Sequence, residues 1–174
     1  MAQTDLRKYG TEERLGKMDL DLIDVEVPLD DGVAYGDGDV LFVVKEIPYA
    51  VSVPGGTGLI HSIAAIISST GGEETGNIDI VITSDVTALG VNANTALNGN
   101  TIDLTGFCGI ASITNIIDAG ANISFGNATN IGMVAKANSG STSLYCYGIA
   151  RSTNTYTTGS NDPKITLRFG IVKD

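Results

Sequence analysis

The sequence predicts an all-β protein, and three features support that prediction. Apolar and polar residues alternate with a period of two in several short segments, which is the pattern of strands that bury one face. Clusters of Gly, Asn, Ser and Pro typical of turns separate these segments at intervals of roughly 10–15 residues. Strands do not alternate with helical patterns, which argues against α/β folds. We therefore expect a single-domain β-sandwich or jelly roll of about eight to ten short strands.

The first 20 residues are expected to form an arm in front of a β domain of residues 21–174. Thr11 and the two glutamates after it suit a helix start, but Gly10 and Gly16 limit any helix to a short turn. An extended arm is the alternative.

The strands of the β domain follow in order. From Leu20 to Val27, aliphatic residues alternate with acids apart from one slip at Ile23, so this strand should have an acidic outer face. The segment Leu59–Ser69 is apolar or small on both faces, which favours a central place in a sheet or a subunit contact. Other strands are expected at 40–47, 78–83, 101–104, 110–117, 123–125, 131–137, 143–150 and 165–172, with loops at 28–39, 71–76 and 152–162 and a loop or short helix at 85–100.

The chain is acidic, and the charge is uneven. Ten basic and twenty acidic residues give a net charge of −10. Residues 1–40 hold eleven acids and four bases, a net of −7, and the remaining nine acids and six bases give −3. This balance argues against nucleic-acid partners and anionic membranes, and an acidic leading segment suits a basic docking surface on another protein. The sequence shows neither a signal-peptide pattern nor a long apolar run, so we expect a soluble protein that is not secreted.

No motif indicates catalysis or a cofactor. His61 is the only histidine and lies in the middle of an expected strand, where a structural role is far more common than general-base chemistry. The G-x-S-x-G pattern of a nucleophile elbow is lacking. We therefore expect a protein that is not an enzyme and binds no cofactor.

Four aspartates in one Gly-rich loop are the best metal candidates. Carboxylates from a turn can bind calcium, but the spacing here does not match the D-x-D-x-D-G pattern. Turn acids exposed to solvent are the alternative. The four residues are Asp30, Asp31, Asp37 and Asp39.

The two cysteines, Cys108 and Cys146, are not part of a metal or redox motif. The sequence leaves open whether they form a disulfide or remain two buried thiols.

Several stretches together resemble small virion structural proteins of tailed bacteriophages, in particular head decoration or cement proteins. The stretches are 4–11, 14–24, 39–42, 47–48, 50–51, 53–56 and 167–174. The resemblance spans most of the chain, although none of the stretches is a mechanistic motif. It implies a β-sandwich homotrimer on the outer capsid surface, assembled in the host cytoplasm, with the major capsid protein as its partner. The Asn/Thr/Gly-rich middle of the chain also suits a fibre or a glycan-binding module.

Within this interpretation the acidic residues 1–40 are the expected docking element. An arm that becomes ordered on the shell would add contacts by coupled folding. The docking candidates are Asp5, Leu6, Arg7, Tyr9, Arg14 and Leu15.

Overall fold

Eleven strands make up the regular structure in the described part of the chain. The computed structural model describes residues 20–29, 33–69, 76–86, 92–97, 106–120, 122–156 and 163–173. Eight strands have six or more residues, and β2, β7 and β10 have two or three. Among the described residues no helix is long and apolar enough to cross a membrane. The strands are β1 (Leu20–Pro28), β2 (Val33–Tyr35), β3 (Val40–Ile47), β4 (Thr57–Ser68), β5 (Ile78–Thr83), β6 (Phe107–Ile113), β7 (Ile117–Asp118), β8 (Ile123–Lys136), β9 (Leu144–Ala150), β10 (Asn154–Tyr156) and β11 (Lys164–Lys173).

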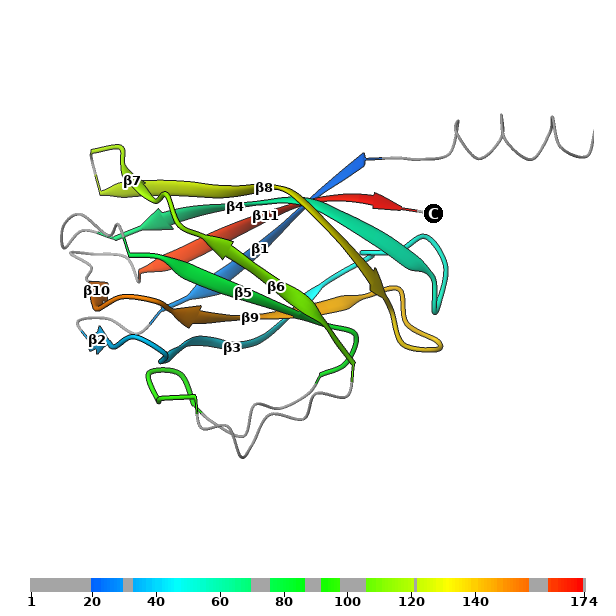
Figure 1. The fold of residues 1–174 in the computed structure, drawn as a ribbon, viewed down its shortest axis with the longest axis horizontal. Helices are drawn as coiled ribbons and strands as arrows, with labels where there is room; N and C mark the ends of the chain where they lie inside the picture. The colour runs from blue at the N-terminus through cyan, green and yellow to red at the C-terminus, as the bar shows by residue number, and fades with distance from the viewer. Residues whose placement is uncertain are drawn as a thin grey trace, which may run out of the picture.

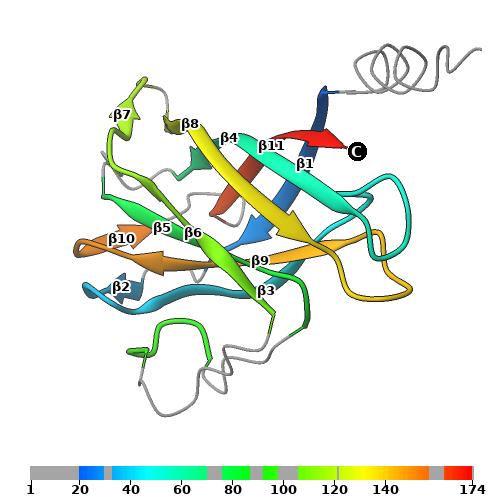
Figure 2. The same cartoon turned by 45° about the vertical axis from the view of Figure 1, so that its right-hand side comes forward.

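The strands form two large antiparallel sheets and one small one. The five-stranded sheet has the order β1-β11-β4-β8-β7, and the four-stranded sheet has the order β3-β9-β5-β6. β10 and β2 form the small sheet. The two large sheets face each other as the layers of a sandwich (Figures 1 and 2). The all-β prediction is confirmed, and so is the central place of the segment that forms β4.

The pairing of the eight long strands is that of a jelly roll. In chain order, the first pairs with the last (β1 with β11), the second with the seventh (β3 with β9), the third with the sixth (β4 with β8), and the fourth with the fifth (β5 with β6). This nesting describes one long hairpin. The pairs β11–β4 and β5–β9 then roll the hairpin into two sheets. Of the two predicted architectures, the structure therefore has the jelly roll.

The core lies between the facing sides of the two large sheets. Ile63, Ala65 and Ile67 of β4 point inward, and Ile80 and Ile82 of β5 do so from the opposite sheet; all five are 0% exposed. β-branched side chains suit this place because they pack well on a pleated surface and bury apolar area that would otherwise face water.

β8 is one strand of 14 residues, whereas the sequence predicted separate strands at 123–125 and 131–137. The two-strand prediction was wrong because a bulge carries β8 through the Gly- and Asn-containing segment between them. From Thr129 to Met133, β8 advances four residues while β4 advances two, from Ser62 to Ile60. Within the bulge Asn130 and Gly132 have φ angles of 56° and 63°, a left-handed conformation that these residue types tolerate.

The short sheet of β2 and β10 arises in two segments that the sequence predicted as loops. Asn154, Thr155 and Tyr156 lie opposite Tyr35, Ala34 and Val33. The rings of Tyr35 and Tyr156 are both buried and meet edge to face, with centroids 5.6 Å apart and an interplanar angle of 68°. This aromatic contact joins two segments far apart in sequence, which is why local composition did not indicate it.

β1 keeps one regular register with β11 along its whole length, so the predicted slip at Ile23 does not occur. Val25 and Val27 are buried, while Leu20 and Leu22 share the outward side with Asp24 and Glu26. The outer face of β1 is therefore acidic at one end and apolar at the other.

Candidate functional site

The six docking candidates of the amino-terminal segment lie outside the described residues, as do Asp30 and Asp31 of the proposed calcium set. Asp37 is exposed in a turn. One carboxylate oxygen of Asp39 accepts a hydrogen bond from the backbone N–H of Gly36 at 2.6 Å, so Asp39 holds its own turn. The described residues contain no group of three or more His, Cys, Asp or Glu side chains that could hold a metal ion. Asp37 and Asp39 thus act as turn residues.

His61 and the two cysteines belong to three different strands, β4, β6 and β9. His61 is exposed at a register shift of β4 against β11. Cys108 and Cys146 are both free thiols, which settles the question that the sequence left open. Burial raises the pKa of Cys108, and complete burial raises the pKa of Cys146 further. Both thiols therefore stay protonated at neutral pH and are poor nucleophiles.

The outer side of the five-stranded sheet, which we call the open face, collects most of the exposed apolar side chains. The described residues include thirteen large hydrophobic side chains that are exposed, and seven of them belong to this face. Scattered exposed aliphatic residues are normal on a protein, but a contiguous group marks an interaction surface. The seven are Leu20, Leu22, Ile66, Ile117, Ile123, Phe125 and Val134.

Strand register divides these side chains into two clusters at opposite ends of the face. The first cluster is a row across four strands, made by Leu20, Val172, Leu59 and Val134, with Leu22 beside it. The second cluster is a row across β4, β8 and β7, made by Ile66, Phe125 and Ile117, with Ile123 beside it.

The band between the two clusters carries small and polar side chains. Gly170, Ser62 and Thr129 lie opposite one another in one row. The next row contains Arg168, Ala64 and Asn127. Gly170 has no side chain, and a Cβ placed there would lie 2.5 Å from the Ser62 hydroxyl. No large side chain therefore projects from the sheet at this point.

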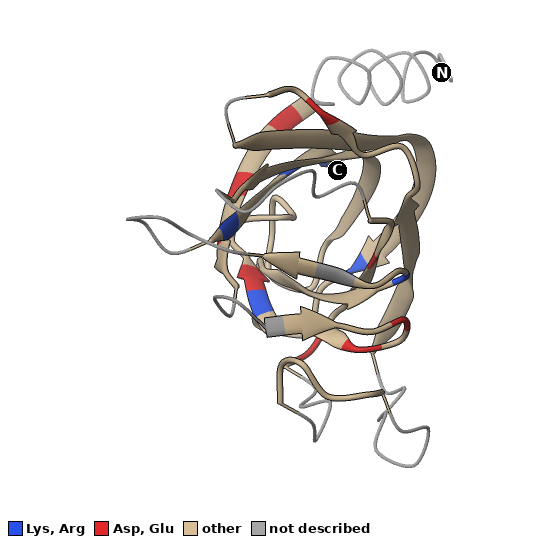
Figure 3. Ribbon diagram, turned by 90° about the vertical axis from the view of Figure 1, so that its left-hand side faces the viewer, with Lys and Arg blue, Asp and Glu red and all other residues tan. Residues whose placement is uncertain are grey.

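Four charged residues of the open face form two ion pairs, and Figure 3 marks the charged positions on the ribbon. Lys136 of β8 is a further exposed charge on this face. Arg168 donates two hydrogen bonds to the Asp24 carboxylate, at 2.7 and 2.8 Å, and lowers the pKa of Asp24 through them. Lys164 donates to Glu26 at 2.8 Å. β11 thus supplies the cations of these pairs and the edge strand β1 the acids, so the described acids of this face are balanced locally on a strongly acidic chain.

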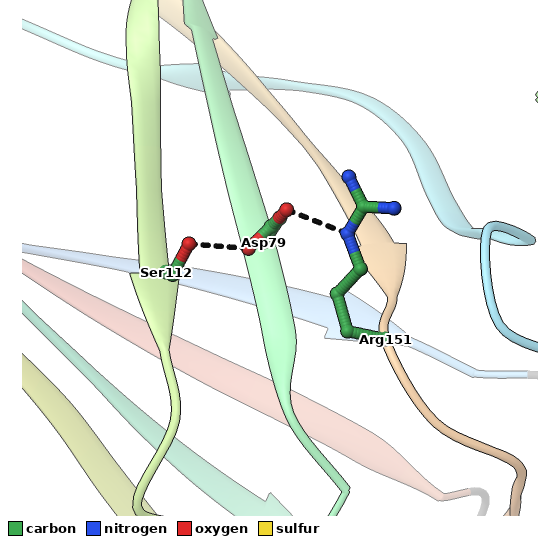
Figure 4. Close-up of polar contacts among 3 residues, drawn as sticks. All are labelled: Asp79, Ser112 and Arg151. Atoms are coloured by element: carbon green, nitrogen blue, oxygen red, sulfur yellow. Dashed lines mark hydrogen bonds and ion pairs between the residues drawn. The ribbon is translucent and has the colours of Figure 1, made fainter.

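The outer side of the four-stranded sheet differs, because several of its side chains are buried. Val81, Tyr147 and Ile149 are 2–3% exposed there. Beside them the Asp79 carboxylate accepts hydrogen bonds from the Ser112 hydroxyl and from Nε of Arg151, both at 2.6 Å (Figure 4). This network links β5, β6 and the end of β9. It is a structural contact rather than a reactive group, since both carboxylate oxygens are engaged.

An open hollow of about 660 Å³ lies beside the start of β6. Phe107 is 44% exposed at its wall, and Lys136 and the loop residue Asn138 also line it. The Ser84 hydroxyl donates to the side-chain oxygen of Asn138 at 3.3 Å. An exposed ring next to amide and hydroxyl groups is the chemistry that sugar recognition uses.

Comparison with known proteins gives little beyond the fold. No family model and no curated protein matches the chain. Among solved structures, a chain of the full particle of Israeli acute paralysis virus heated to 63 degrees is similar over 99% of this chain and 79% of its own length, with 8% identity and a TM-score of 0.35. A chain of Desmodium yellow mottle tymovirus covers 88% of this chain and 87% of its own, with 13% identity and a TM-score of 0.24. Both TM-scores are low, so the jelly-roll assignment rests on the strand pairing.

The sequence interpretation missed the open face. Its signal was present in the sequence of β1. Every second residue back from Val27 points inward, which includes Val25 and Ile23, so the residues between them, Leu22 and Leu20 among them, point outward. The cluster around Phe125 had no comparable signal, because it is assembled from three strands far apart in the chain.

Proposed function

We propose that this chain is a capsid decoration, or cement, protein that binds the outer surface of a phage head and stabilises the shell without catalysing a reaction. The observation that carries the proposal is the complete jelly roll, one of the folds used by viral capsid domains as well as by lectins and cupins. Fold alone does not decide function, so the surfaces must also fit the role.

The surfaces fit a protein that works by contact with other proteins. Apolar side chains fill the sandwich interior, and the open face presents two apolar clusters around a neutral band. A compact β domain with exposed apolar clusters suits protein–protein packing. The Asp39, Asp79 and cysteine side chains are occupied or protonated, which supports a role without catalysis.

Contact with the major capsid protein is assigned to the acidic residues 1–40, with Asp5, Leu6, Arg7, Tyr9, Arg14 and Leu15 as the docking candidates. Opposite charge on the shell would steer the many copies to their places, and many weak contacts would act together. The homotrimer and its assembly in the host cytoplasm are the parts of the proposal that come from the resemblance to decoration proteins alone.

The experiment adds the purified chain to phage heads that lack it and measures binding by co-sedimentation and shell stability by thermal release of DNA. The full chain should bind and raise the release temperature. A variant without residues 1–19 should fold, as judged by its circular dichroism and melting, but bind much more weakly. Strong binding by the truncated chain would move the docking element into the β domain, and no binding by the full chain would contradict the decoration role.

A second candidate function is glycan binding by a fibre-type module of the virion, and the hollow beside Phe107 favours it. Glycan-array binding that is lost in Phe107→Ala would support this function. Ile110→Ala is the matched control, because Ile110 is an exposed apolar residue of the same strand that does not line the hollow.

A further inference from the structure

We propose that the open face is the contact between two copies of this chain, packed face to face about a two-fold axis. The proposal does not depend on the capsid role, since it concerns the isolated protein. Its first support is the distribution of exposed apolar side chains: seven of thirteen gather on this face, at 37–65% exposure. The opposite sheet instead buries Val81, Tyr147 and Ile149 on its outer side. The outer side of the four-stranded sheet is thus partly buried, whereas the open face presents most of the exposed apolar side chains.

The charge pattern points to a second copy as the occupant. A chain with a net charge of −10 repels its own kind over most approaches. On the open face, however, Asp24 is paired with Arg168 and Glu26 with Lys164. The acids of two such faces therefore meet already paired, and the remaining charge, Lys136, lies beyond the Val134 row at the hollow. A strongly basic partner would find no unpaired acid among the described charges of this face.

The placement of the two clusters fits a two-fold axis. On β4, Leu59 and Ile66 mark the two clusters, and Ser62 and Ala64 lie between them. An axis that runs across the strands through this middle band exchanges the two ends of the face. Leu59 of one copy then lies over the partner's Ile66.

The same axis acts in the same way on β8. Val134 of one copy then lies over the partner's Phe125, so that the β4 and β8 parts of the two clusters cover each other. On the edge strand β1, Leu20 and Leu22 lie over the partner's ion-paired acids instead. An isologous contact of this kind is self-complementary, as most homodimer contacts are. Gly170 and Ala64 have little or no side chain, so the middle of the face allows the two sheets to approach to the usual spacing of about 10 Å.

The first test is the mass of the purified full chain in solution, by light scattering and native mass spectrometry across a dilution series. The expected result is an even number of chains: a dimer, or a hexamer where trimers also form. Phe125→Glu should raise the dissociation constant of the face-to-face contact about a hundredfold or more, because it places an unpaired charge in an apolar contact. Ile110→Glu is the matched control, with the same charge change at a similarly exposed residue (48% against 49%) of the other sheet, and it should leave the mass unchanged.

The second test does not depend on how well Phe125→Glu folds. A Cys108→Ser background removes the half-buried thiol, and Cys146 is fully buried. Ala64→Cys in this background places a thiol next to the axis, where a short bis-maleimide should link two copies in high yield. Lys45→Cys, on the other sheet, should link poorly under the same conditions.

The outcomes separate cleanly. An even mass that Phe125→Glu but not Ile110→Glu reduces, together with linkage through Ala64→Cys, supports the proposal. A monomer or a bare trimer at every concentration, or equal linkage at both cysteine positions, overturns it. An open face that becomes protected only on addition of shell protein also overturns it and assigns the face to that partner. None of these results bears on whether the amino-terminal segment binds heads.

Discussion

Gly148 of β9 and Phe42 of β3 form the contact whose perturbation tests the strand pairing most sharply. The two residues lie opposite each other in the register, and Phe42 is 2% exposed. A Cβ added at Gly148 would lie 2.3, 2.7 and 3.0 Å from three carbons of the Phe42 ring. Carbon atoms in contact are normally about 3.5–4.0 Å apart, so the buried ring would have to move by about 1 Å.

We expect Gly148→Ala to lower the free energy of unfolding by about 2 kcal/mol. Overpacking costs about 1–3 kcal/mol, and the loss of unfolded-state freedom on replacing glycine offsets about 0.4–1 kcal/mol of it. For a chain of this size the melting temperature should fall by roughly 4–8 °C. Urea denaturation and thermal melts followed by circular dichroism measure both quantities.

Two controls identify the Phe42 ring as the cause. In a Phe42→Leu background the penalty of Gly148→Ala should shrink by about 1 kcal/mol or more, which a double-mutant cycle measures. Gly109→Ala brings a Cβ within 2.8 Å of Met133, but only of the flexible end of its side chain, so its cost should stay within about 0.5 kcal/mol. A Gly148→Ala variant that is as stable as the parent, or a penalty unchanged by Phe42→Leu, would mean that β3 and β9 do not pair in this register.

Three further predictions follow from the polar groups. Asp79→Ala should lower the free energy of unfolding by about 1–3 kcal/mol in urea denaturation, because two donors lose their acceptor; an unchanged midpoint would contradict the network. Burial raises the pKa of both thiols, so iodoacetamide should label Cys108 slowly and Cys146 only after unfolding; fast labelling of Cys146 in the native protein would refute its burial. The free energy of unfolding should also fall as the pH rises above the ordinary thiol pKa, because the thiols of the unfolded chain ionise first. Arg168 lowers the pKa of Asp24, so this pair stabilises the fold above the ordinary carboxyl pKa, and the stabilisation is lost as the pH falls through the lowered value. Carbon NMR titration should show a higher Asp24 pKa in Arg168→Gln than in the parent. An identical titration curve would show that the pair does not form in solution.

The sequence was sufficient for the fold class because the signal for strands is local. Segments such as Ile78–Thr83 place an isoleucine at every second position, and glycine-rich clusters separate them, so all-β architecture followed from the pattern alone. The choice of a jelly roll over another sandwich depends on which strands pair. That information lies in contacts such as Phe42 over Gly148, between residues about a hundred positions apart, and no local pattern contains it.

The same reason explains what was missed at the surface. The Phe125 cluster exists only because β4, β7 and β8 lie side by side, and the pairing of Arg168 with Asp24 only because β11 returns beside β1. The continuity of β8 was missed because Asn130 and Gly132 are turn residues by composition, and here they form a bulge instead. Local composition identifies unusual backbone conformations without distinguishing a turn from a bulge.

The proposed place of this jelly roll, on the outside of a phage head, can be seen in images of whole particles. If the proposed role is correct, cryo-electron microscopy of purified phage particles that contain the chain should show density on the outer surface of the shell into which the two sheets fit as a rigid body. Gold-labelled antibodies against the chain should decorate the heads of the same particles. Density and label confined to the tail tip or to fibres, with bare heads, would contradict the decoration role and favour glycan binding by a fibre-type module.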